Sequence, residues 1–425
     1  MKILRNPLVV LGGAYAVLWC AVYAYTTSKG FLSFQFVSEG LSVDPFQYDA
    51  LARSLATHGT FSLDGVTPFF EREPGYSVFL AFVYLVFGVG SYVAVFAVQA
   101  ILHFLATVAF VRSVRPFLAR NTWIGLAALL LFSPPVFHAL FALTRESLAL
   151  SLCMFLTASL FSLRRSPSYA RAALAGALLG VLLVVNVPFL LFPVGLAALL
   201  LWWRVPWTRV ALCMAIAGAV LSPWVIRNER LRGMPCVTGC YREALQWHVR
   251  GEQAEHIGIG IEPAMCLWAE YVSRNWDDRS PYCSFNAVWH AKWPEGFVGV
   301  PADISVTKEG KSKILAHFQN YLWFSLFEVV ELHLPYVNGW GRAYNVLAVL
   351  WTIVVYVGCV FSLRKLRSTE YLLFAAFMLY LTGIYSLTDA TPRYLVPILH
   401  CYAFLAVLGY TGLRPWFVAP SSSRP

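Results

Sequence analysis

The sequence predicts an all-α polytopic membrane protein. Of its 425 residues, 59% are hydrophobic and 13% are charged, with a mean hydropathy of +0.63, whereas soluble domains have about 25% charged residues. Apolar runs close to the ~20 residues that cross a bilayer recur along most of the chain. In lipid these runs must be helices, because a helix satisfies its own backbone hydrogen bonds. An ordinary cytosolic enzyme is excluded.

The basic residues orient the chain, so the net charge of +10 is a topology signal and not a nucleic-acid-binding surface. Lys2 and Arg5 precede an apolar run without a small-residue cleavage site, which places the N-terminus inside. The later basic clusters are also inside if the chain crosses an odd number of times between Thr27 and Arg112. The short apolar run 76–89 is therefore placed along the outer interface. We expect about 10 spans, with both termini inside: 7–27, 91–112, 121–139, 146–163, 171–187, 189–203, 209–225, 344–363, 370–387 and 394–413.

This topology divides the chain into three parts. Residues 1–225 form a transmembrane half with interfacial helices in a first periplasmic loop, 28–90. Residues 226–343 form a larger second periplasmic loop, and 344–425 return to the membrane. Of the 22 acidic residues, all but Glu370 fall outside. The outer face is therefore expected to carry the polar chemistry.

The second loop contains four cysteines. In an oxidising compartment they favour two disulfides, most simply Cys236 with Cys240 and Cys266 with Cys283, although three pairings are possible. Paired C-x-x-C zinc motifs, a P-loop and a G-x-G-x-x-G motif are absent from the sequence. The loop is also expected to cover the outer end of the membrane-spanning part, with aromatics that either stack on a ligand or form a small core. These aromatics are Trp247, Trp268, Trp276, Tyr282, Trp289 and Trp293.

The first loop predicts an amphipathic helix at the membrane surface. It begins at Asp44-Pro45, and Tyr48, Leu51 and Leu55 follow at helical spacing. Asp44 is either the N-terminal cap of this helix or a general base whose pKa is raised by apolar surroundings.

Charged residues also gather at the outer ends of four apolar segments. Each arginine alone is explained better as a snorkelling anchor than as a binding residue. Together, cations and carboxylates at one apolar mouth fit a lipid phosphate headgroup and an acid–base step. The charged candidates for binding are Glu71, Arg72, Glu73, Arg145, Glu146, Arg227 and Arg393, and the motifs described next add Tyr48, Tyr76, Asn228 and Tyr394.

Five short motifs carry a family resemblance. They are Asp44-x-x-x-Tyr48, Arg72-Glu73-Pro74-Gly75-Tyr76, Leu143-Thr144-Arg145-Glu146, Pro223-Trp224-x-x-Arg227-Asn228 and Arg393-Tyr394-x-x-Pro397. In this order the chain resembles the bacterial GT-C glycosyltransferases related to family 39, which include protein O-mannosyltransferases and the aminoarabinose transferase of lipid A.

The resemblance implies a polyprenyl-phosphate-linked sugar donor, a periplasmic active site and transfer with inversion. Asp44 then corresponds to the base that deprotonates the acceptor, Glu71 and Arg72 to a pair beside the donor phosphate, and Glu146 to an acidic residue of the second outer loop. The chain departs from the family pattern at two places. Asn186-Val187-Pro188 replaces a frequent Thr-Arg-Pro and removes one phosphate cation, and His400 replaces a proline.

We therefore expect a bacterial inner-membrane glycosyltransferase that moves one sugar from the lipid carrier to a periplasmic glycan, lipid or protein. Arginines would stabilise the phosphate leaving group, so no metal or other cofactor is required, and a divalent ion stays open. The alternative function is a multi-span transporter or lipid-linked sugar flippase. That class predicts ionisable residues near the bilayer midplane and repeated broken helices.

Overall fold

The regular secondary structure of the described residues is helical, as predicted, apart from one isolated bridge between Ser62 and Pro68. The computed structural model describes residues 7–28, 44–70, 72–119, 121–233, 235–238, 240–261, 304–335, 342–363, 369–388 and 392–412. The helices up to the middle of the chain are α1 (Pro7–Ser28), α3 (Asp44–His58), α4 (Pro74–Phe87), α5 (Tyr92–Val114), η2 (Arg115–Phe117), α6 (Thr122–Leu131), α7 (Pro134–Leu140), α8 (Glu146–Arg165), α9 (Tyr169–Val185), η3 (Val187–Phe189), α10 (Phe192–Trp202) and α11 (Trp207–Arg232). The later ones are α12 (Cys240–His256), α15 (Ile304–Ala316), α16 (Phe318–Leu332), α17 (Arg342–Ser362), α18 (Thr369–Thr388), η5 (Pro392–Ile398) and α19 (Leu399–Gly412).

Every expected span coincides with helix, but not every helix has the length of a span. Within the described residues, six segments are long and apolar enough to cross a membrane, and they include α1, α5, α8, α11, α17 and η5 with α19. The pair α6 and α7 makes a seventh if it is one span, bent by 44° where Pro134 and Pro135 cannot donate to the preceding turn. The spans expected at 171–187, 189–203 and 370–387 correspond to the shorter apolar helices α9, α10 and α18.

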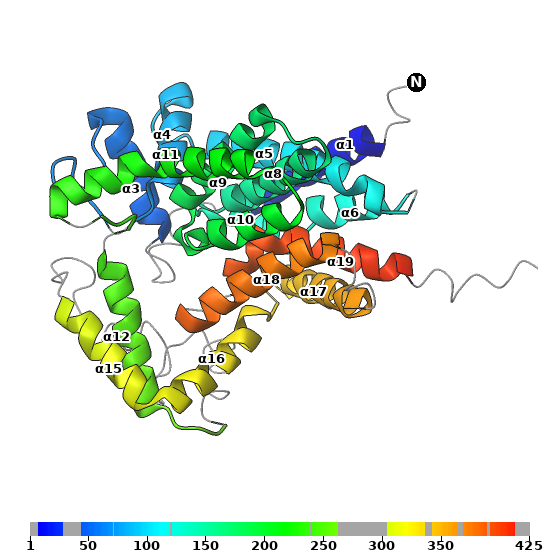
Figure 1. The fold of residues 1–425 in the computed structure, drawn as a ribbon. Coiled ribbons are helices and arrows are strands. Elements are labelled where there is room, and N and C mark those ends of the chain that lie inside the picture. Colours follow the sequence, from blue (N-terminus) through cyan, green and yellow to red (C-terminus); the bar gives the residue numbers. More distant parts are fainter. Residues whose placement is uncertain are drawn as a thin grey trace, which may run out of the picture.

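Two segments lie at the centre of the fold. In α8, 83% of the apolar stretch is buried, and in η5 with α19 the share is 89%, against 6% in α1. Figure 1 shows α17, α18 and α19 as one layer beneath the bundle that contains α5, α8, α9 and α11. The N-terminal end of α8 and the start of η5 are therefore both held in place by surrounding helices.

Small residues let neighbouring helices approach closely, as is common between membrane helices. On α9, Gly176 faces the main chain of Cys213, and Gly180 faces Ala217 and Val220 of α11. On the other side of the fold, Gly358 of α17 lies against the backbone of α19. Side chains at these glycines would separate the helices.

The outward face of α17 is apolar. Its exposed side chains recur every three or four residues, so they form one stripe, whereas Ala348, Thr352, Val355 and Gly358 are buried. Such a stripe on a membrane protein fits contact with lipid. The exposed set is Val346, Leu347, Leu350, Ile353, Val354, Val357 and Val360.

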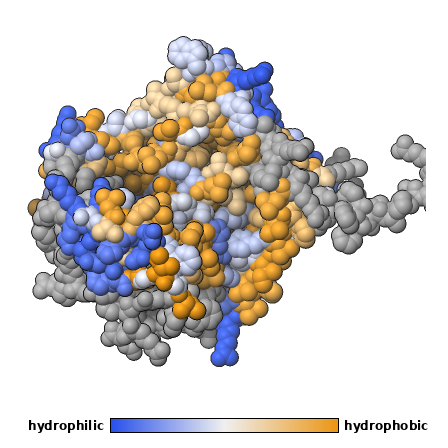
Figure 2. Space-filling view, turned by 60° about the horizontal axis from the view of Figure 1, so that its bottom comes forward, coloured by the Kyte–Doolittle hydropathy of each residue, from blue (hydrophilic) through white to orange (hydrophobic). Residues whose placement is uncertain are grey.

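Figure 2 shows hydrophobic residues over much of the described surface. The largest group of hydrophilic residues is on the left, the side on which Figure 1 places α12 and α15.

The region expected as the second loop contains helices. Figure 1 shows α12 and α15 side by side, with α16 next to them. Gly251 and Gly310 meet where α12 and α15 cross, and Trp247 packs against a small cluster of Ala254, Ile314 and Tyr321. Trp247 thus belongs to a small core. The other loop aromatics singled out from the sequence, Trp268, Trp276, Tyr282, Trp289 and Trp293, lie outside the described residues.

The predicted disulfide between Cys236 and Cys240 is wrong, because Cys236 is a free cysteine. Its main chain is held by α11: the Asn228 side-chain amide donates to the carbonyl of Cys236 at 2.8 Å. Cys266 and Cys283 lie outside the described residues, and only the backbone of Cys240 is described.

Candidate active site

Asp44 is the first residue of α3, and α3 is fixed by a second carboxylate further along it. Asp49 is 3% exposed. It accepts hydrogen bonds from Tyr84 Oη at 2.5 Å, from Tyr92 Oη at 3.1 Å and from Arg53 Nε at 2.7 Å. Because Tyr84 belongs to α4 and Tyr92 to α5, these bonds hold α3 against both helices and so position its N-terminal end.

Asp44 bridges two arginines from distant parts of the chain. Its Oδ1 lies 2.5 Å from Arg72 Nη2, and its Oδ2 lies 2.8 Å from Arg393 Nη2. Arg72 is buried and also donates from Nε to Gln47 Oε1 at 2.5 Å, while its guanidinium lies over the Tyr48 ring. Ion-paired hydrogen bonds of this kind are about twice as strong as neutral ones. The structure thus brings together three residues that the sequence singled out.

A second ion pair lies beside the first and is more deeply buried. Arg145 and Glu73 form a salt bridge with both residues at 5% exposure or less. The Tyr48 phenol donates to Glu73 Oε2 at 3.1 Å. Burial, and after it the Glu73 carboxylate, raise the pKa of Tyr48, so the phenol keeps the proton that it donates. This pair joins the start of α8 to the turn that precedes α4.

Glu146 is the first residue of α8 and is buried. Its Oε1 lies 3.9 Å from Arg393 Nε. Its Oε2 is buried and has no hydrogen-bond partner in the described part of the chain. A carboxylate is favoured at a helix N-terminus, but a buried acceptor without a donor costs free energy. The Glu146 Oε2 atom is therefore suited to a donor group of a bound molecule.

Tyr76 belongs to a neutral network next to these charges. The Tyr76 phenol donates to Gln99 Oε1 at 3.0 Å, and the Ser147 hydroxyl donates to the same oxygen at 2.7 Å. Gln99 in turn donates to the carbonyl of Leu140 at 2.9 Å. Sequence reasoning missed Gln47 and Gln99, although Gln47 lies one helical turn after Asp44 and Gln99 is a polar residue inside the apolar helix α5.

The partners of Arg227 and Asn228 differ from those of Asp44. The Arg227 guanidinium stacks on the rings of Phe61, Phe70 and Trp224 at 4.4–5.6 Å. It donates to the carbonyl of Phe69 at 3.4 Å and to Asn228 Oδ1 at 2.8 Å. These contacts place the chain just before Arg72. Glu71, which the family resemblance placed beside the donor phosphate, lies outside the described residues.

The two departures from the family pattern have different surroundings. Asn186 Oδ1 accepts from Tyr385 Oη at 3.4 Å, and the Tyr385 ring stacks on Tyr394 at 4.7 Å. Tyr394 in turn lies under the Arg393 guanidinium. Asn186 therefore reaches the cluster through two tyrosine rings. His400 is buried among core residues, 5.2 Å from the Phe110 ring and 3.2 Å from the Thr157 hydroxyl.

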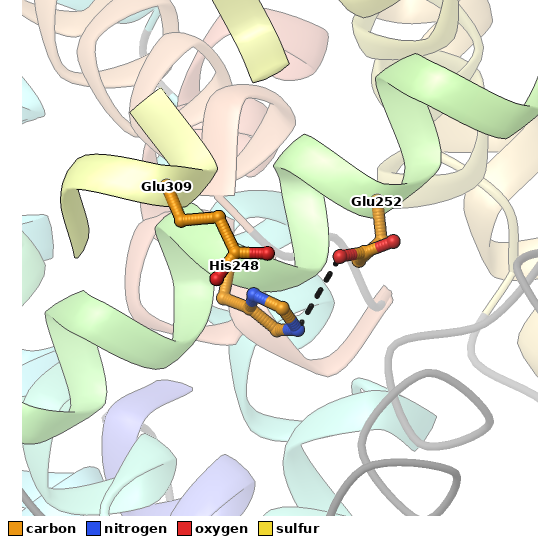
Figure 3. A group of neighbouring side chains, drawn as sticks. All are labelled: His248, Glu252 and Glu309. Atoms are coloured by element: carbon orange, nitrogen blue, oxygen red, sulfur yellow. Dashed lines mark ion pairs between the residues drawn. The ribbon is translucent and has the colours of Figure 1, made fainter. Parts of the chain in front are cut away.

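A separate cluster with metal-ligand chemistry lies between α12 and α15. Figure 3 shows His248 and Glu252 of α12 with Glu309 of α15; each residue offers one ligand atom, and these atoms lie within 4.8 Å of one another. Lys313 already supplies a cation there, with Nζ 2.6 Å from Glu252 Oε1 and 2.6 Å from Glu255 Oε2. The hydrogen bond from Lys313 also lowers the pKa of Glu255. The ion pairs of Lys313 with Glu252 and Glu255 thus link α15 to α12.

The fold and the site define an all-helical membrane protein with a cluster of ion-paired arginines and carboxylates. No family model matches the chain, and no match was found among curated proteins. Among solved structures, the chain is similar to ArnT from Cupriavidus metallidurans in the apo state, with 17% identity, 96% of this chain and 81% of that chain covered, and a TM-score of 0.38. The same protein bound to undecaprenyl phosphate matches with 14% identity, 97% and 81% coverage, and a TM-score of 0.38. The resemblance predicted from the motifs included the aminoarabinose transferase of lipid A, which is ArnT. At this TM-score the site stands on its own geometry.

Proposed function

We propose that the chain is a membrane glycosyltransferase that moves one sugar from a polyprenyl-phosphate-linked donor to an extracytoplasmic acceptor. The observation that supports this most is the contact of one carboxylate, Asp44, with two arginines, Arg72 and Arg393. A base beside two anion-binding groups is the minimum that an inverting transfer from a phosphate carrier needs.

The proposed reaction is a single displacement. The acceptor oxygen attacks the anomeric carbon of the sugar while its proton passes to the Asp44 carboxylate. The bond between the anomeric carbon and the phosphate oxygen breaks, and its electron pair stays on the phosphate. The products are the glycosylated acceptor, with inverted configuration, and the polyprenyl monophosphate. No cofactor is needed to balance this step, and the scheme leaves divalent metal dependence open.

The arginines suit the charge changes in this step. As the bond breaks, the phosphate gains one negative charge while Asp44 loses one by accepting the proton. Arg72 and Arg393 carry two positive charges beside this carboxylate, and they would stabilise the phosphate as its negative charge grows. Planar guanidinium groups also bind phosphate oxygens in pairs, which fixes the leaving group.

Glu146 and Tyr48 have supporting roles in this proposal. The free Oε2 of Glu146 would accept a hydrogen bond from a hydroxyl or amino group of the sugar. Tyr48 would hold Arg72 in position through its ring, and the Glu73–Arg145 pair would hold the start of α8. Arg227 and Asn228 would act indirectly, by positioning the chain before Arg72.

We also propose ten spans in the bacterial inner membrane, with both termini in the cytoplasm and Asp44 on the periplasmic side. The three short helices α9, α10 and α18 would then cross together with their flanking residues. The distribution of basic residues supports this orientation. Cysteine labelling in intact cells should reach a cysteine at His58 and spare one at Ser168; labelling of Ser168 from outside would contradict the placement.

The test of the function is binding of undecaprenyl phosphate to the purified protein in detergent. Arg72→Ala and Arg393→Ala should each weaken binding about tenfold or more, because each removes a charge-assisted hydrogen bond worth roughly 1.5–3 kcal/mol. Lysine at either position should restore only part of the affinity, since an ammonium lacks the guanidinium fork. Arg230→Ala is the matched control, because Arg230 is an exposed arginine of α11. Unchanged affinity in both Arg72→Ala and Arg393→Ala would refute the proposed donor site.

A further inference from the structure

The carboxylate of Asp44 occupies the place that a phosphate would need. Its two oxygens lie 2.5 Å from Arg72 Nη2 and 2.8 Å from Arg393 Nη2. A phosphate that bound the same two arginines would use the same N–H groups, because carboxylates and phosphates are recognised alike by guanidinium. In this structure, therefore, the base and the anion-binding residues neutralise one another.

A carboxylate held in this way is a poor base. Both of its oxygens already accept hydrogen bonds from positive groups, and accepting a proton from a hydroxyl would weaken both ion pairs. For Asp44 to act as a base, another anion has to replace it as the partner of at least one arginine. The incoming donor supplies that anion at the required place.

We propose that the donor phosphate competes with Asp44 for Arg72 and Arg393, so that donor binding itself releases the catalytic base. The inference rests on the proposed function and deepens it, because it sets an order of events. The donor binds first, the two arginines pass from Asp44 to its phosphate, and only then does Asp44 face an acceptor hydroxyl. Without donor, the acceptor is not activated.

The surroundings of the three groups determine which of them moves. Arg72 is held by Gln47 Oε1 at 2.5 Å and by the Tyr48 ring, and Arg393 by the Tyr394 ring. Both guanidinium groups therefore stay in place when Asp44 leaves. Asp44 is the first residue of α3 and its side chain is 17% exposed. A rotation about its side-chain bonds would separate it from both arginines, and the N-terminus of α3 would still stabilise its charge.

The neighbouring ion pair lacks these properties. Glu73 and Arg145 are both nearly inaccessible, and Glu73 is also held by the Tyr48 phenol. If a phosphate replaced Glu73 as the partner of Arg145, the Glu73 charge would stay buried without its cation, which is costly. The two adjacent pairs are thus assigned different roles, one exchangeable and one permanent.

The experiment compares binding of undecaprenyl phosphate to the wild-type protein and to Asp44→Asn. Asparagine keeps the shape and much of the capping ability of aspartate but carries no charge to compete for the arginines. Asp44→Asn should bind the lipid phosphate about tenfold more tightly than wild type, because the arginines no longer have to leave a partner. Transfer should be lost in the same variant, since an amide cannot accept the proton.

Two controls make the result specific. Glu229→Gln removes the same charge from an exposed position on α11, and its affinity should stay within twofold of wild type. Asp44→Ser removes the carboxylate while keeping a residue that caps helices, and it should bind as tightly as Asp44→Asn. Thermal unfolding in detergent establishes that each variant is folded.

The possible outcomes separate this inference from the function on which it rests. If Asp44→Asn and Asp44→Ser are folded but bind no more tightly than wild type, while Arg72→Ala and Arg393→Ala bind more weakly, the donor site stands and the competition is refuted. If the arginine variants also bind like wild type, the proposed function itself fails. Tighter binding in both Asp44 variants, with weaker binding in both arginine variants, supports the inference.

Discussion

Asp44 and Asp49 lie on the same helix, and their partners differ in kind. Asp49 is buried and is held by two tyrosines and by Arg53 within its own helix. Asp44 is partly accessible and is held by two arginines that come from other segments. Residue type does not distinguish the two carboxylates; what distinguishes them is whether a bound anion could take the place of the carboxylate beside its partners.

The buried ion pair of Glu73 and Arg145 gives a prediction for single residues. Arg145→Met should lower the free energy of unfolding by about 3–5 kcal/mol, because it leaves the buried Glu73 carboxylate without its cationic partner. The double variant Arg145→Met with Glu73→Leu should recover much of that loss, since both charges of this pair are removed. Denaturant or thermal unfolding in one detergent measures both. A double variant as unstable as the single one would contradict a charge-based explanation.

The sequence identified most of the residues of the cluster but not their partners. Asp44, Arg72, Glu73, Arg145, Glu146 and Arg393 could be chosen because charged side chains at apolar helix ends need a reason to be there. Arg227 looked equivalent to Arg72 in sequence, yet its partners are the rings of Phe61, Phe70 and Trp224. Those contacts depend on how α11 packs against the first loop, which residue spacing does not reveal.

At the scale of helices, the long apolar helices could be predicted, because the length and hydropathy of a sequence segment indicate them. The start of α3 at Asp44 and the bend between α6 and α7 also follow local rules, from Asp-Pro and Pro-Pro steps. Helices α12, α15 and α16 were expected as loop, since short surface helices are not marked by long apolar runs. The predicted disulfide between Cys236 and Cys240 is wrong, because Cys236 is a free cysteine; close spacing of two cysteines in a sequence does not fix their pairing.

Helix packing gives a prediction of opposite sign at two glycines. A Cβ at Gly180 of α9 would lie 2.6 Å from the Val220 Cβ and 2.9 Å from the Ala217 carbonyl oxygen of α11. Gly180→Ala should therefore destabilise the protein by about 1–3 kcal/mol through overpacking. At Gly218, on α11 itself, a Cβ would meet no atom within 4 Å. Gly218→Ala should be neutral or stabilise by up to about 1 kcal/mol, as helix propensity predicts.

Thermal unfolding of both alanine variants in the same detergent checks this prediction. Alanine tolerated equally at Gly180 and Gly218 would mean that α9 and α11 are further apart than the structure has them.

At the scale of the whole molecule, the site exists only when distant parts of the chain come together. Asp44 and Arg393 are 349 residues apart in sequence, and Arg72 and Glu146 reach the same place from the turn before α4 and from α8. The central burial of α8 and of η5 with α19 makes this assembly possible. A sequence can indicate that such residues share one face of a membrane, but their convergence is a property of the complete helix packing.

The central claim is that this chain consumes a polyprenyl-phosphate-linked sugar with Asp44 as the base. The most direct measurement is mass spectrometry of lipid extracts from cells that lack the protein. We predict that a polyprenyl-phosphate-linked sugar accumulates in these cells, that the wild-type protein removes the accumulation, and that an equally abundant Asp44→Asn variant does not. If no lipid-linked sugar accumulates, or if Asp44→Asn removes it as the wild type does, the account is contradicted.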